Sequence, residues 1–264
     1  MTKAYPKFIS GSTLKIIAII AMIIDHIGLG IWYRLPFMGY LVPDIMDQDT
    51  WWSIYRIMRN IGRIAFPLFC FLLVEGFFHT GSRKKYAFRL FAFALISQLP
   101  FHYAFSDLYG VTDGLNVFFT LVIGFIAIWG MHEVKRRVPN HLAYLSAWLL
   151  IAVSSCVIAV QLDTDYDFKG VVLIIVLYIF HKSRIISLII GYFSFKWVLL
   201  SPKLTNITTV FASYFEYIAE DYCFPGFILA SFYNGKRGLK IKYLFYLIYP
   251  IHLLLIFIIW NFIL

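Results

Sequence analysis

An adjacent aspartate and histidine inside a long apolar run are the residues of this sequence best placed for chemistry. Asp25 and His26 lie within residues 13–32, and Lys15 precedes the histidine by eleven positions. Eleven residues make almost three helical turns, so Lys15 and His26 share a helix face, about 16 Å apart along the axis. The run is long enough to cross a bilayer, where ionisable side chains are costly and usually functional.

A histidine beside a carboxylate suits two kinds of chemistry. The imidazole titrates near neutrality, so His26 can take a proton from an amine or a hydroxyl as a general base. The same pair suits the proton relay of a transporter or flippase. The sequence contains no P-loop, no His-x-x-x-His pair and no Gly-x-Ser-x-Gly motif, so nothing favours phosphate-loop, metal or serine-nucleophile chemistry.

Other ionisable residues also fall inside apolar segments. Arg63 is expected near the outer end of the second predicted span, with Glu75 and His79 near its inner end as an i,i+4 pair. Arg89 in the third span should reach the same inner level, which makes it a candidate ion-pair partner of Glu75. His252 is expected at mid-membrane depth in the last span.

Structural roles remain open for several of these groups. Lys15 could anchor its helix end at the interface, and His252 could bond carbonyls that Pro250 frees. Lys196 and Glu216 are expected to form a structural pair. The aspartate of the first span has no such explanation, because it adds desolvation cost without a packing gain.

The composition predicts the architecture that must position these residues. The 264 residues are 61% hydrophobic and 14% charged, with a mean hydropathy of +0.78, against about 45–50% and about 25% in soluble domains. We therefore expect an all-α, polytopic transmembrane helix bundle that forms one domain over 1–264. Three widely separated cysteines indicate no disulfide framework and no metal site. The first helix lacks a small-residue cleavage site, so we interpret it as retained.

Long apolar segments predict about nine membrane spans. The sixth is short, and the eighth is interrupted by acidic residues and Pro225. Between the first two spans, Arg56, Arg59 and Arg63 follow at helical spacing, which predicts an interfacial helix on the outer side. The nine spans are expected near residues 12–33, 62–80, 85–106, 115–134, 141–160, 168–181, 184–201, 207–232 and 242–263.

Basic and acidic loops alternate between these spans. Positive charge is retained on the cytoplasmic side, so the N-terminus should lie inside and the C-terminus outside. The loops also account for the net charge of +9 without a nucleic-acid partner. The basic set contains Lys3, Lys7, Arg83, Lys84, Lys85, Lys135, Arg136, Arg137, Lys182, Arg184, Lys236, Arg237, Lys240 and Lys242. The acidic set contains Asp44, Asp47, Asp49, Asp107, Asp113, Asp163, Asp165 and Asp167.

Several stretches resemble the TraX family of membrane proteins. The most specific are Met-Ile-Ile-Asp-His-Ile-Gly at 22–28 and Arg-Ile-Ala-Phe-Pro at 63–67. The resemblance is dense over about 14–125 and returns at 163–180 and 233–253. The spacing from Lys15 to His26 is also similar to the Arg/Lys-x10-His signature of the membrane acyltransferase-3 group. The stretches that carry the resemblance are 14–18, 22–28, 59–69, 74–80, 85–90, 96–101, 115–121 and 246–252.

The resemblance implies a membrane acetyltransferase, because the family's name-giver is associated with N-acetylation of a pilin. It implies a multi-pass protein of the bacterial cytoplasmic membrane. The implied reaction moves an acetyl group from cytosolic acetyl-CoA to an amine or hydroxyl on the extracytoplasmic side. The implied acceptor is a pilin N-terminus or an envelope glycan. A proton-coupled transporter and a non-catalytic assembly factor are the alternatives. We predict that His26 is the base and Asp25 orients and charges its ring, and the sequence leaves direct transfer and an acetyl-histidine intermediate as alternatives. The residues predicted to bind substrate or acetyl-CoA are Lys15, Arg63, Glu75, His79, Arg89, Asn116 and His252.

Overall fold

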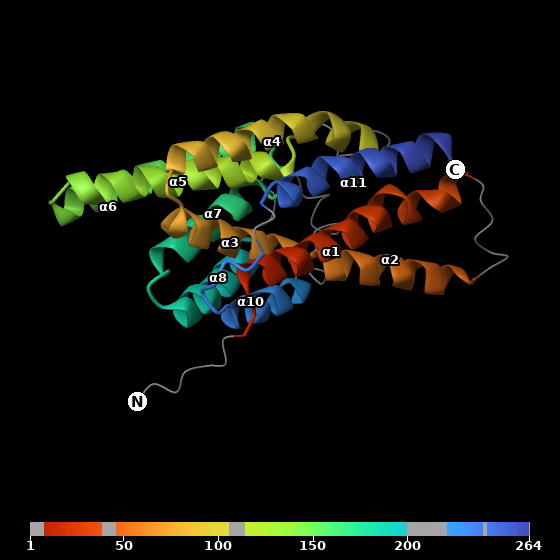
Figure 1. Cartoon of the computed structure of the whole chain (residues 1–264), viewed down its shortest axis with the longest axis horizontal. Helices are drawn as coiled ribbons and strands as arrows, with labels where there is room; N and C mark the ends of the chain where they lie inside the picture. The colour runs from red at the N-terminus through yellow and green to blue at the C-terminus, as the bar shows by residue number, and fades with distance from the viewer. Residues whose placement is uncertain (1–7, 39–45, 106–113, 200–220, 240–241, 264) are drawn as a thin grey trace, which may run out of the picture. The chain divides into compact units, whose positions relative to one another are not determined.

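The computed structural model describes residues 8–38, 46–105, 114–199, 221–239 and 242–263 (Figure 1). The regular elements of these residues are all helices, as expected, and β-pairing among them is limited to isolated bridges between Ile9 and Tyr233 and between Leu115 and Thr164. The chain divides into two compact units. The first comprises 1–69, 103–106 and 199–264, and the second comprises 70–102 and 107–198. The expectation of a single domain stays a prediction.

The first unit contains both ends of the described chain. Its first helix begins where Ser10 caps it, by accepting a hydrogen bond from the Thr13 backbone N–H. Asp47 caps α2 in the same way through Thr50, and these hydrogen bonds hold the pKa of Asp47 below its usual range. The unit contains α1 (Gly11–Gly30), η1 (Trp32–Met38), α2 (Gln48–Gly62), the start of α3 (Ala65–His79), η3 (Asp221–Cys223), α10 (Phe224–Ser231) and α11 (Lys242–Phe262).

Helices α1 and α2 form an antiparallel hairpin. The indole rings of Trp32 and Trp51 stack with centroids 4.0 Å apart at the end where the chain passes from α1 to α2. Towards the middle, a Cβ added to Gly28 would meet the Met58 Cβ at 3.0 Å, so the glycine lets the two backbones approach. Small residues at such contacts are typical of helix packing in membranes.

Helix α11 lies beside α1 and runs in the same direction (Figure 1). Ser12 donates its backbone N–H to the Arg237 carbonyl, which joins the start of α1 to the segment before α11. Further along, a Cβ added to Gly30 would meet Ile256 at 2.6 Å. The two helices therefore begin together and stay in contact over most of their length.

The second unit contains the rest of α3 and most of α4, together with α5 to α8. Helices α5, α6 and α7 pack on one another. Gly124 of α5 faces Ile174 of α7 at a position where a side chain would clash. The bounds are Arg83–Ala104 for α4, Val117–Arg137 for α5, His141–Gln161 for α6, Asp167–Ile179 for α7 and Arg184–Leu199 for α8.

Five helical stretches of the described chain are long and apolar enough to cross a membrane. Four match predicted spans closely, whereas the second starts earlier than expected, because the stretch Gln48–His79 includes the amphipathic α2 before the apolar α3. Helices α7 and α8 have only 13 and 16 residues, and the predicted span 207–232 lies largely outside the described residues. The count of nine and the inside N-terminus stay predictions. The five are Gly11–Leu35, Gln48–His79, Val117–Arg137, His141–Gln161 and Tyr243–Phe262.

Candidate functional site

Two histidines meet where α1 packs on α11. Nδ1 of His26 lies 2.7 Å from Nε2 of His252, and the ring planes differ by 9°. The centroids are 5.0 Å apart, which exceeds the N–N distance by about two ring radii. The rings therefore meet edge to edge in nearly one plane, as an in-plane hydrogen bond requires, and are not stacked face to face.

The two rings differ in how much of their hydrogen-bonding capacity is used. His252 is buried, and its Nδ1 lies 2.8 Å from the Ile248 carbonyl oxygen, so both of its nitrogens are engaged. Pro250 frees the Tyr246 carbonyl, four residues before it, so His252 does not bond the carbonyl that the proline releases. His26 is half-buried, and within the described chain its Nε2 has no hydrogen-bond partner.

Aromatic rings flank the half-buried histidine. Phe105 contacts the His26 ring edge-on with centroids 5.5 Å apart, and Tyr249 does so at 6.1 Å. An imidazole held in this way has one engaged nitrogen and one that can accept a proton. This is the arrangement that a general base or a proton relay needs.

The structure corrects the expected role of Asp25. We expected its carboxylate to orient the neighbouring imidazole, but Oδ2 of Asp25 accepts a hydrogen bond from Nη1 of Arg59 at 2.8 Å. Adjacent helix positions point about 100° apart, so Asp25 faces α2 while His26 faces α11. Arg63 adds positive charge near the same carboxylate. Asp25 therefore belongs to the α1–α2 contact.

Gly62 makes the close approach of Asp25 and Arg59 possible. A Cβ added to Gly62 would overlap the side chain of Asp25. The ion pair is largely shielded, with 20% of the Arg59 side chain and 16% of the Asp25 side chain exposed. The sequence signal for this pair was the arginine spacing on α2, which identified Arg59 but not its partner.

Lys15 contacts the same helix as His26, as their spacing predicts. Its Nζ lies 5.4 Å from the centroid of the Phe245 ring on α11. Lys15 and His26 therefore lie on the same face of α1, as their spacing of eleven residues predicts, and both contact α11 at different points along its length.

Predicted site residues of the second unit are engaged in other ways. Nδ1 of His79 donates to the Glu75 carbonyl oxygen at 2.8 Å and lies 3.8 Å from the Glu75 carboxylate. The expected ion pair between Glu75 and Arg89 is absent among these described residues, because the Arg89 guanidinium lies over the Tyr86 ring instead, 5.6 Å from its centroid. These contacts are local to α3 and α4.

Asn116, also predicted to bind substrate, is used entirely by the fold. Its Nδ2 donates to the Ala94 carbonyl and to the Gln98 side chain, at 2.8 Å each. Its Oδ1 accepts from the Phe118 backbone N–H and caps α5. The side chain is fully buried. In this structure Asn116 ties α4 to the start of α5.

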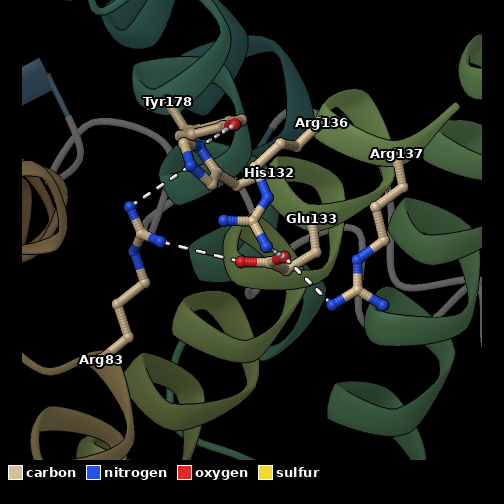
Figure 2. Close-up of polar contacts among 6 residues, drawn as sticks. All are labelled: Arg83, His132, Glu133, Arg136, Arg137 and Tyr178. Carbon is tan, nitrogen blue, oxygen red and sulfur yellow. Dashed lines mark hydrogen bonds and ion pairs between the residues drawn. The ribbon is translucent and has the colours of Figure 1, made fainter. Parts of the chain in front are cut away.

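A second polar cluster joins the adjacent ends of α4, α5 and α7 (Figure 2). Glu133 accepts ion pairs from three arginines: Arg136 at 2.9 Å, Arg137 at 3.4 Å and Arg83 at 3.8 Å. Arg83 also lies over the Phe77 ring, 4.5 Å from its centroid. The cluster holds three guanidinium groups on one carboxylate, so it keeps an excess of positive charge.

His132 connects this cluster to the interior of the second unit. Its Nε2 lies 3.3 Å from Nη2 of Arg83, and its Nδ1 lies 3.4 Å from the Tyr178 hydroxyl (Figure 2). Arginine can only donate, so Nε2 of His132 accepts the bond. The sequence placed Arg83, Arg136 and Arg137 in basic loops on the cytoplasmic side. It gave no signal that Glu133 is their common ion-pair partner.

Comparison of the sequence with known proteins identifies similar proteins over nearly the whole chain. The family model described as "TraX protein" matches residues 10–260. A probable fimbrial assembly protein, FimC of serogroup H1 from Dichelobacter nodosus, is 32% identical over 257 residues, which cover 94% of each chain. An uncharacterized protein of Rickettsia prowazekii is 43% identical over 65 residues, 25% of this chain and 18% of its own length. No solved structure matches the chain.

Proposed function

The chain belongs to the TraX family, and from that membership we propose that it is a membrane-embedded acetyltransferase. It moves an acetyl group from cytosolic acetyl-CoA to an amine or hydroxyl on the outer side of a bacterial cytoplasmic membrane. The observation that carries the proposal is His26, which has one nitrogen held by His252 and the other without a partner in the described chain. That nitrogen can serve as the base that acyl transfer to an amine or hydroxyl needs.

The proposed reaction uses His26 to move one proton. Nε2 of His26 takes the proton of the acceptor amine or hydroxyl as the nitrogen or oxygen bonds to the thioester carbonyl carbon. The C–S bond then breaks, and the departing CoA sulfur takes the proton from the imidazolium. Lys15 is assigned to holding the CoA, because it lies about 16 Å along α1 from His26 and so cannot reach the thioester carbonyl that is attacked there.

Two groups of basic side chains suit the phosphates of acetyl-CoA. Lys236 and Arg237 adjoin the start of α1 in the first unit, and Arg83 lies in the arginine cluster of the second unit (Figure 2). Arginine forks match phosphate oxygens in two parallel hydrogen bonds. The proposal places both groups on the cytosolic side, where acetyl-CoA is made available.

The proposed topology has nine spans with the N-terminus inside. It is supported by α1 and α11, which begin together and run in the same direction. These two helices are the first and the last predicted spans. Because they cross the membrane in the same direction, the total number of spans must be odd, as nine is. The basic residues Lys236 and Arg237 then lie on the same side as the N-terminus, in agreement with the positive-inside rule.

We extend the proposal to the acceptor. The relative from Dichelobacter nodosus is named as a probable fimbrial assembly protein and matches 94% of this chain. The proposed direction of transfer requires an acceptor on the outer side of the membrane, and the N-terminal amine of a fimbrial subunit is an acceptor of the required chemistry. We therefore propose that amine as the acceptor, with an envelope glycan hydroxyl as the second choice.

Proteoliposomes can test the direction and the acceptor together. Vesicles contain a peptide with a free N-terminus or the same peptide with a blocked N-terminus, and acetyl-CoA is added outside. Protein inserted with its cytosolic side outward should acetylate only the free peptide, as mass spectrometry of the enclosed peptide reports. Acetyl-CoA that stays intact while the protein dissipates a pH gradient would instead identify a proton-coupled transporter.

A further inference from the structure

The hydrogen bonds of His252 determine where the protons lie on both histidine rings. A backbone carbonyl only accepts, so Nδ1 of His252, 2.8 Å from the Ile248 oxygen, must carry a hydrogen. In a neutral His252 the lone pair is then on Nε2. That lone pair faces Nδ1 of His26 at 2.7 Å, so His26 must donate from Nδ1. The lone pair of His26 is therefore on Nε2.

We propose that His252 is a positioning residue that holds His26 in the tautomer with its lone pair on Nε2. The proposal rests on the proposed function, because it concerns the nitrogen that accepts the proton of the acyl acceptor. When Nε2 of His26 takes that proton, the ring carries hydrogens on both nitrogens. Nδ1–H then points at Nε2 of His252, so the two rings share the added positive charge through one hydrogen bond.

The tautomer matters because an isolated imidazole favours the other form. In water the hydrogen of neutral histidine resides mainly on Nε2. A hydrogen there would block the nitrogen that must take the proton of the amine or hydroxyl. A buried hydrogen-bond acceptor that faces Nδ1 reverses this preference. Groups that accept a hydrogen bond from the other ring nitrogen fix the tautomer of catalytic histidines in the same way. Here the acceptor comes from α11, at the far end of the sequence from α1.

The surroundings keep this hydrogen bond in place. His252 is 7% exposed, so little water competes for its nitrogens. Tyr249 lies one turn earlier on α11 and contacts the rings of both histidines, with centroids 6.1 Å from His26 and 5.5 Å from His252. The nearly coplanar rings align the N–H of one with the lone pair of the other.

Nitrogen-15 NMR of histidine-labelled protein in detergent tests the proposal without any acetyl-transfer assay. The chain has seven histidines, and the signals of His26 are identified by their loss in His26→Gln. We expect His26 of the wild type to show a protonated Nδ1 and an unprotonated Nε2. A wild-type His26 with its proton on Nε2 would overturn the proposal, and this result needs no variant of His252.

Two substitutions at 252 separate tautomer control from simple packing. His252→Gln keeps a side-chain oxygen that can accept from Nδ1 of His26, whereas His252→Leu keeps bulk and removes the acceptor. We expect His26 to stay in the Nδ1–H form in His252→Gln and to shift towards Nε2–H in His252→Leu. Unchanged His26 signals in a folded His252→Leu protein would contradict the proposal. The exposed His141 on α6 provides the control variant His141→Gln.

Kinetics add an arm that depends on the proposed function. We expect His252→Leu to lower kcat by about 10²-fold with little change in KM, and His252→Gln to restore it to within about tenfold of the wild type. The expected tautomer without acetyl transfer in any preparation would refute the proposed function and leave the positioning role standing. Acetyl transfer by a protein whose His26 carries its proton on Nε2 would refute the positioning role alone.

Discussion

Nδ1 of His26 and Nε2 of His252 lie 2.7 Å apart, although 226 residues separate them in the chain. The contact is polar, yet it sits in the interface between two strongly apolar helices. A polar pair at such a place costs desolvation, which its own hydrogen bonds offset only in part. Under the proposed function, the two histidines occupy this interface, in place of two packed aliphatic side chains, because they move a proton.

The close contact of α1 with α2 should depend on the absence of a side chain at Gly62. We expect Gly62→Ala to lower the free energy of unfolding by about 1–3 kcal/mol, because the added methyl overlaps Asp25. The thermal unfolding midpoint in detergent measures the effect. Gly81→Ala is the matched control, since a Cβ added there meets nothing within 4 Å. Equal midpoints for the two variants would show that the helices do not pack as described.

The ion pair of Asp25 and Arg59 should show energetic coupling. We expect Asp25→Asn and Arg59→Gln each to destabilise the protein, because each leaves a shielded charge without its partner. The double variant should recover about 1–3 kcal/mol relative to the sum of the single effects. A double-mutant cycle of unfolding free energies checks this. Arg56→Gln, on an exposed side of the same helix, should show no coupling to Asp25→Asn.

Asn116 should be important for stability and not for substrate binding. We expect Asn116→Ala to lower the free energy of unfolding by about 2–4 kcal/mol, since it removes a helix cap and two buried hydrogen bonds. Asn140→Ala removes only the exposed cap of α6 and should cost about 1 kcal/mol. A normal unfolding midpoint with a raised KM for either substrate would instead support the role predicted from sequence.

The arginine cluster should contribute to acetyl-CoA binding. We expect Arg83→Gln to raise the Kd for acetyl-CoA about tenfold, which corresponds to one charge-assisted hydrogen bond to phosphate. Titration calorimetry in detergent measures the change. Lys169→Gln removes the same charge at the start of α7, away from the predicted cytosolic side, and should leave the Kd unaltered. Equal affinities for both variants would place the phosphates elsewhere, with Lys236 and Arg237 as the next candidates.

The sequence was sufficient to predict the all-helical class and several of the long helices, because apolar length is a local property. The predicted spans 141–160 and 242–263 agree with α6 and α11 to within a few residues. The face shared by Lys15 and His26 was also predictable, since helical periodicity alone sets it. Both residues contact α11 as that periodicity requires.

The partners of the polar residues were not predictable in the same way. Asp25 bonds Arg59 and not the neighbouring histidine because two adjacent helix positions face different helices. The contact between His26 and His252 depends on which helices pack together, and hydropathy carries no information about that choice. Asn116 belongs to a stretch that resembles the family, and the resemblance could not separate a structural residue from a substrate ligand.

The most direct test of the proposed activity is the release of CoA from acetyl-CoA by the purified protein in detergent, compared between the wild type and His26→Ala. The account predicts release that depends on an added amine or hydroxyl acceptor and falls by at least about 10²-fold in His26→Ala. Both proteins should bind acetyl-CoA with similar affinity and unfold at similar temperatures. Undiminished CoA release by a folded His26→Ala protein would contradict the assignment of His26 as the catalytic base.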